Sequence, residues 1–156
     1  YKIGGNYAAS FRATEPAHSE GMGCIFLDSK FHRYIDECGA ANFIGIRGNE
    51  YITPKSASIL PSITNNSLMT LAKSQGMKVV RRHVPVEELA TFEECGACGT
   101  ACVIAPINKI IDPDKNMIYN FGNKPGERCV KLYNALQDIQ YGRTTDPYGW
   151  CEVLPF

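Results

Sequence analysis

The segment over residues 58–68 constrains the fold most strongly, because a short apolar run there passes directly into a helical pattern. The run is typical of a strand, and Pro61 is placed as a first-turn proline of a helix that begins at Ser62. Gly76 is typical of the residue that ends such a helix. The apolar residues that recur at helical spacing are Ile63, Leu68, Leu71 and Ala72. The pattern therefore predicts a strand followed at once by a helix.

A helix entered in this way presents unpaired amide groups and the positive end of its dipole, which can bind an anion. Ile63 and Thr64 would supply the amides of a phosphate site, and the Thr64 hydroxyl would be a further donor. The alternative is a first turn that is capped by its own side chains or by water. The pattern alone leaves both interpretations open.

The composition indicates one compact domain with an ordinary core. The chain has 156 residues, 44% of them hydrophobic, and its 16 Lys and Arg balance its 16 Asp and Glu. It contains no charge run, so we expect a small substrate and neither nucleic acid nor a membrane as partner. No apolar run of about 18 residues occurs, so no membrane-spanning helix is predicted.

Seven cysteines are an odd number for a disulfide framework, and three of them crowd together at Cys95, Cys98 and Cys102. We therefore expect free thiols in a cytoplasmic protein. Cys95 and Cys98 form a C-x-x-C pair, which can be a redox dithiol or part of a metal site. No second pair follows at metal-ligand spacing, so we interpret the three as small buried thiols in a glycine-rich turn, without a metal.

Strands and helices alternate along the chain. Helices are expected over residues 7–18, 62–75, 86–92 and 126–141, with Pro16 bending or ending the first of them. Strands are expected at residues 24–27, 34–35, 42–46, 51–53, 77–80 and 117–121. The small residues that follow Glu94 are expected to enter one buried strand that continues to Ile111. The apolar side of the last helix is expected to comprise Val130, Tyr133, Leu136 and Ile139. This order predicts a mixed α/β class with one sheet-based core.

Two charged residues follow or precede strand-like runs and could carry chemistry. Lys2 precedes a Gly-Gly-Asn-Tyr turn, and a lysine that is removed from water has a lowered pKa and can attack a carbonyl. Glu37 precedes a Cys-Gly pair, a position that suits a carboxylate held inside a site. The alternatives are a surface lysine and a surface turn glutamate.

In combination, these motifs resemble the branched-chain amino acid aminotransferases, a family of fold type IV that uses pyridoxal 5'-phosphate (PLP). The stretches that carry the resemblance are residues 2–10, residues 37–39 with Asn42 and Phe43, residues 59–64, residues 99–101 with Pro106, and residues 140–142 with Trp150. The resemblance implies an α/β mixed-sheet pseudo-barrel with surrounding helices. It also implies that residues 1–156 are the PLP-binding large domain and that a smaller N-terminal domain precedes them.

The resemblance implies a cofactor role for three residues near the start. Lys2 would bind PLP as an imine and move the proton between substrate and cofactor. Tyr7 would hydrogen-bond the phenolic oxygen of the cofactor. Glu37 would keep the pyridine nitrogen protonated, since opposite charges about 4 Å apart attract by about 4 kcal/mol at an effective dielectric near 20.

Two further segments would hold the phosphate and the substrate. The resemblance implies that the amides of Ile63 and Thr64, together with Thr100, bind the phosphate. The turn of Thr100 and Ala101 would offer backbone donors to the substrate carboxylate. Ala40 stands where some relatives carry a threonine that lines the site, so it is expected to contact the substrate.

The implied activity is transfer of the amino group of leucine, isoleucine or valine to 2-oxoglutarate, by a homodimer in the full-length protein. Its partners would be small amino acids and 2-oxo acids. The chain alone is expected to have little or no activity, because the preceding domain would supply half of the substrate pocket. The alternatives are a PLP lyase or a D-amino acid aminotransferase of the same fold, and, in another class, a cysteine-based metal or redox module.

Overall fold

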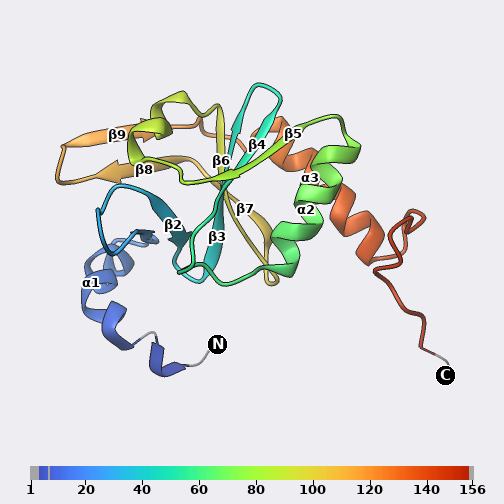
Figure 1. Ribbon diagram of the computed structural model, residues 1–156, viewed down its shortest axis with the longest axis horizontal. Helices are drawn as coiled ribbons and strands as arrows, with labels where there is room; N and C mark the ends of the chain where they lie inside the picture. The colour runs from blue at the N-terminus through green and yellow to red at the C-terminus, as the bar shows by residue number, and fades with distance from the viewer. Residues whose placement is uncertain (1–3, 7, 155–156) are drawn as a thin grey trace.

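A computed structural model describes residues 4–6 and 8–154 and is centred on a seven-stranded sheet (Figure 1). The strands of this sheet are β1 (Ile25–Leu27), β2 (Ile35–Cys38), β3 (Ala41–Arg47), β4 (Glu50–Pro54), β5 (Lys78–Arg82), β6 (Glu94–Gly99) and β7 (Val103–Ile107). A separate hairpin comprises β8 (Lys109–Asp112) and β9 (Met117–Asn120). The helices are η1 (Gly4–Asn6), α1 (Ala8–Ser19), α2 (Ile63–Ser74), η2 (Val86–Thr91) and α3 (Glu127–Gln140). None of these described helices is long and apolar enough to cross a membrane.

Strand β3 is the centre of the sheet, because both of its edges are paired. Strands β2 and β4 share one edge, β2 at the start of β3 and β4 at its end, while β6 occupies the other edge. Only the β4–β5 pair of this sheet is parallel among the described strands. The mixed α/β class is therefore confirmed, and the described strands form an open sheet rather than a closed barrel.

Two apolar cores lie on opposite faces of this sheet. Helices α2 and α3 cover the first core on one face, and η2 and the β8–β9 hairpin contribute to the second core on the other face (Figure 1). Two glycines allow close packing inside the strands. A Cβ atom at Gly45 would lie 2.8 Å from the Phe92 ring, and one at Gly96 would lie 3.0 Å from the Ile104 side chain. Small residues at these positions are thus required by the packing.

The region around α2 differs from the expectation at its start and agrees at its end. Residues 58–61 form turn and irregular backbone instead of a strand, and Pro61 lies before the Ser62 cap, outside the helix. The expected apolar residue Ile63 is 84% exposed. Gly76 does end the helix, since it has a φ of 80° and its amide donates to the carbonyl of Lys73.

Other expectations fail in whole or in part. The predicted strand from Glu94 to Ile111 is in fact β6, β7 and β8, because residues 100–102 reverse the chain and only then does β7 pair with β6. Helix α1 continues three residues past Pro16, so of the two expectations for this proline the early end is wrong, and the bend stays a prediction. The buried side of α3 comprises Cys129, Leu132, Leu136 and Ile139, whereas Val130 and Tyr133 are exposed.

Helix α3 is capped by a residue from another element. Its N-cap is Gly126, which has no side chain, and the Glu94 carboxylate of β6 accepts hydrogen bonds from the amides of Arg128 at 2.9 Å and Cys129 at 2.8 Å. A carboxylate is favourable there because it faces the positive end of the helix dipole. A Cβ atom at position 126 would lie 2.0 Å from Cδ of Glu94, so only glycine leaves room for this cap.

Gly126→Ala should therefore displace the Glu94 carboxylate and destabilise the fold by about 2 kcal/mol. Urea unfolding measures the change. Gly23→Ala is the matched control, because a Cβ atom there meets nothing within 4 Å. Equal unfolding midpoints for the two variants would contradict the tertiary cap.

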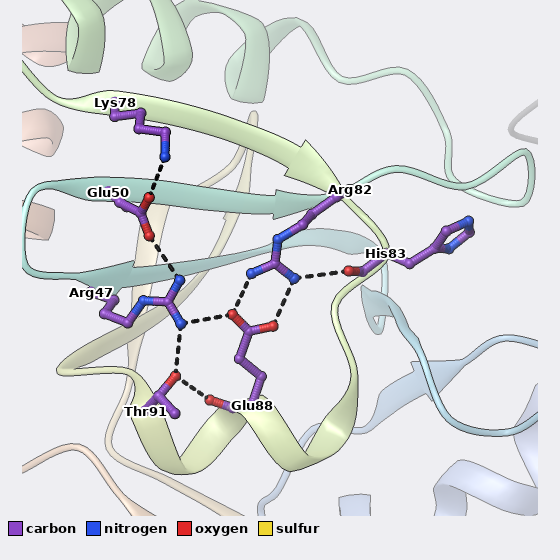
Figure 2. Close-up of polar contacts among 7 residues, drawn as sticks. All are labelled: Arg47, Glu50, Lys78, Arg82, His83, Glu88 and Thr91. Carbon is purple, nitrogen blue, oxygen red and sulfur yellow. Dashed lines mark hydrogen bonds and ion pairs between the residues drawn. The ribbon is translucent and has the colours of Figure 1, made fainter.

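An ion cluster joins the β3–β4 hairpin to β5 and η2 (Figure 2). Glu50 pairs with Arg47 and Lys78, each at 2.8 Å, and Glu88 of η2 pairs with Arg47 at 3.0 Å and with Arg82. The hydrogen bond from Lys78, and then that from Arg47, lowers the pKa of Glu50 to about 2. Arg82 in the same way lowers the pKa of Glu88. These ion pairs hold η2 in place against the second core.

Because both carboxylates have lowered pKa values when folded, they stabilise the fold fully above their ordinary pKa of 4.5 and lose this effect as the pH falls through the lowered pKa values, of which that of Glu50 is about 2. Glu88→Gln should be less stable than the parent chain by about 1 kcal/mol at neutral pH, and the difference should shrink in acid. Urea unfolding across this pH range tests it, with the exposed Glu93→Gln as control. A difference that does not vary with pH would refute the linkage.

Candidate functional site

Glu37 contacts the segment that leads into α2. Its carboxylate oxygen Oε1 accepts a hydrogen bond from the Leu60 amide at 3.1 Å and one from Nδ2 of Asn42 at 3.4 Å. The same Asn42 amide group donates to the Leu60 carbonyl at 3.4 Å. Asn42 is buried at the start of β3, directly opposite Glu37 in the register. These contacts bring the predicted acid and the approach to the predicted helix N-terminus to one place.

The first turn of α2 is only partly self-capped. The Ser62 hydroxyl accepts from the Asn65 amide at 3.0 Å, and the Ser62 carbonyl accepts from the Asn66 amide at 3.1 Å. The amides of Ile63 and Thr64 precede these bonds and have no acceptor in the part of the chain that the structure describes. Self-capping therefore accounts for one amide of this turn, and the other two are left for a ligand or for water.

The β6–β7 turn lies at the same end of the sheet. Cys98 pairs with Asn42, and a Cβ atom at Gly99 would lie 3.8 Å from that of Ala41, so the following Thr100 and Ala101 lie beyond the start of β3. Both are exposed. Ala40 is also exposed, in the turn between β2 and β3. The predicted residues Lys2 and Tyr7 lie outside the described residues.

The cysteines of the C-x-x-C pair do not form a joint site. They lie in β6 and not in a glycine-rich turn, and residues three apart in a strand point to opposite faces. Cys95 accordingly belongs to the second core and Cys98 to the first, while Cys102 is exposed in the β6–β7 turn. Burial raises the pKa of Cys98 to about 12 and also raises the pKa of Cys95, which keeps both as thiols. Among the residues described, no group of three potential ligands could hold a metal.

The sequence interpretation misses the polar residues that support the site. Asn42 belongs to one of the motifs without a role of its own, although an asparagine that begins an apolar strand signals a buried hydrogen bond. Asn65, Thr53 and Tyr51 form a buried hydrogen-bonded group beneath the first turn of α2. No local pattern indicates this group, because the three residues meet only when α2 packs on β4.

Together, the fold and these contacts define a mixed α/β domain in which two free helix amides of the described α2 turn, a carboxylate and an exposed hairpin turn gather at one end of a sheet. Residues 2–110 match the family described as amino-transferase class IV. The chain belongs to this family.

Known members support the assignment. A branched-chain-amino-acid aminotransferase of Helicobacter pylori is 47% identical over 96% of this chain and 44% of its own length. The structure of the Escherichia coli branched-chain amino acid aminotransferase superposes with a TM-score of 0.81 at 29% identity, over 96% of this chain and 49% of that one. The T.th. enzyme of the same name, solved with pyridoxamine 5'-phosphate, gives a TM-score of 0.81 at 25% identity over 96% and 48%. The chain thus spans about half the length of the relatives it matches.

Asn42→Asp tests the contact between Glu37 and the approach to α2. The new carboxylate would face Oε1 of Glu37, which now accepts a hydrogen bond from position 42 at 3.4 Å. Like charges raise both pKa values in the folded state, so the variant should lose stability as the pH rises from about 4 to 7, by roughly 2 kcal/mol.

Urea unfolding at the two pH values measures this loss. Asn49→Asp is the control, because the Asn49 side chain also donates to a carbonyl, that of Gly76 at 2.7 Å, on the exposed surface. If both variants respond alike to pH, the proximity of Asn42 to Glu37 is refuted.

Proposed function

We propose that this chain is the PLP-binding domain of a branched-chain aminotransferase, which transfers the amino group of leucine, isoleucine or valine to 2-oxoglutarate. The observation that carries the proposal is the 3.1 Å hydrogen bond between the Leu60 amide and Glu37, which brings the carboxylate beside an anion-binding helix. Membership of the class IV family and the names of the relatives support the reaction and the substrate class.

The residues present fit the phosphate of PLP. The amides of Ile63 and Thr64 would bind it at the positive end of the α2 dipole, with the hydroxyl of Thr100 as a further donor. The cap by Ser62 favours this use, because it satisfies the third amide of the turn and holds the first two in place. We take the phosphate site to lie between α2 and the β6–β7 turn.

The carboxylate of Glu37 would keep a proton on the pyridine nitrogen of the cofactor. Bound PLP supplies an electron-withdrawing ring that makes the Cα–H bond of an amino acid acidic. Lys2 would hold the cofactor and carry the proton at Cα, and Tyr7 would donate to the phenolic oxygen; both roles rest on the resemblance. The backbone of Thr100 and Ala101 would bind the substrate carboxylate, and Ala40 would line the substrate pocket.

We further infer that the sheet is part of the pseudo-barrel of this fold and that the whole enzyme is a homodimer. Strands β2 to β5 curve toward one another, since the Ile35 amide donates to the Val84 carbonyl and the Val86 amide to the Arg33 carbonyl, each within 2.9 Å. These bonds join the start of β2 to the segment after β5.

Adding PLP to the chain tests the proposal. We expect a visible absorbance that changes when leucine is added and that is lost in Lys2→Ala but kept in Lys131→Ala, an exposed lysine on α3. A transaminase also requires a 2-oxo acid as amino acceptor, whereas a lyase of the same fold does not.

Stoichiometric zinc or iron in the purified protein, with no PLP absorbance, would instead support the cysteine-based module.

A further inference from the structure

A chain of buried hydrogen bonds connects the first turn of α2 to the sheet. The Tyr51 hydroxyl donates to Oδ1 of Asn65 at 2.7 Å, and Nδ2 of Asn65 donates to the Thr53 hydroxyl at 3.0 Å. The Thr53 hydroxyl in turn donates to the Phe43 carbonyl at 2.8 Å. The hydroxyl of Thr53 has one proton, which goes to that carbonyl, so the hydroxyl oxygen must accept from Nδ2 of Asn65. This fixes the orientation of the Asn65 side-chain amide. Each link has one possible direction.

The side chain of Asn65 connects the first turn of α2 to the sheet. Ile63 is 84% exposed and Asn66 is also exposed, whereas Asn65 is 6% exposed and Tyr51 and Thr53 are buried at 0% and 1%. The backbone amide of Asn65 donates to the Ser62 hydroxyl, so the residues on both sides of Ile63 and Thr64 are held in place. Rotation of this turn would break a buried hydrogen bond, so the fold opposes it.

Tyr51 also lies in the buried core that contains a residue of β6. Tyr51 and Cys98 both belong to this core and are both fully buried. Cys98 lies two residues before Thr100, and Asn65 directly follows Thr64. The buried side chains therefore bridge the two segments that present donors at this end of the sheet. This also gives Cys98 a structural role that the C-x-x-C pattern does not suggest.

We propose that Tyr51, Asn65 and Thr53 are positioning residues, which hold the amides of Ile63 and Thr64 in register with the Thr100 turn so that both bind one phosphate group. The nature of the ligand rests on the proposed function, while the positioning itself does not. Backbone donors bind an anion well only when they are already oriented, because each one contributes little if the turn must first be ordered.

Two isosteric variants test this proposal. Tyr51→Phe removes the donor to Asn65, and Thr53→Val removes the acceptor for it. Thr70→Val is the matched control, because its hydroxyl donates within α2, to the Asn66 carbonyl at 3.0 Å, and does not touch the buried group. We expect each test variant to bind inorganic phosphate and PLP roughly tenfold more weakly than the parent chain, and the control to bind them unchanged.

Amide hydrogen exchange of the unliganded chain gives a second readout. We expect the amides of Asn65 and Asn66 to exchange roughly tenfold faster in both test variants, at temperatures where the rest of α2 keeps its protection. Unchanged exchange in both variants would overturn the positioning role. If the parent chain binds neither phosphate nor PLP, the proposed function fails, and the exchange rates still decide the role of the three residues.

Discussion

The pairing of β3 on both edges is the constraint on which the rest of the structure depends. Because β2 and β4 share one edge and β6 takes the other, the start of β3 lies beside the end of β2 and the end of β6. Antiparallel pairing then places the turns after β2 and β6, and the loop after β4, at the same end of the sheet. Asn42 occupies this end and connects Glu37 to Leu60. The site is thus a consequence of strand order.

Close packing on both faces keeps β3 in this position. Gly45 and Gly96 admit the Phe92 ring and the Ile104 side chain against the backbone, so strands and covering elements approach without a gap. Glu94 adds a polar connection, since it caps α3 from the neighbouring strand. The ion cluster around Glu88 acts similarly on the opposite face. Each of these covering elements is therefore fixed by an apolar core and by a specific polar contact.

The sequence predicted what depends on local pattern and missed what depends on strand pairing. The helix ending at Gly76 and the mixed α/β class followed from spacing and turn residues. The β6–β7 hairpin did not, because its turn, residues 100–102, lacks glycine, and the run of small residues is typical of one strand. On the apolar side of α3, Leu136 and Ile139 were predicted, but Cys129 and Leu132 take the place of Val130 and Tyr133, because they face the core that α3 shares with α2 and β7. The placement of Glu37 beside the α2 approach was expected only from the family resemblance.

The ion cluster and the candidate site use charge differently. Around Glu88, paired carboxylates and cations tolerate water, and their contribution follows pH and salt. At the site end, the described donors are backbone amides, a hydroxyl and the amide of Asn42, with Glu37 as the carboxylate. Such donors carry partial charges, so their attraction for an anion depends on orientation more than on net charge. Under the proposed function, the buried uncharged residues Tyr51, Asn65 and Thr53 beneath the first turn of α2 would supply this orientation through their hydrogen bonds.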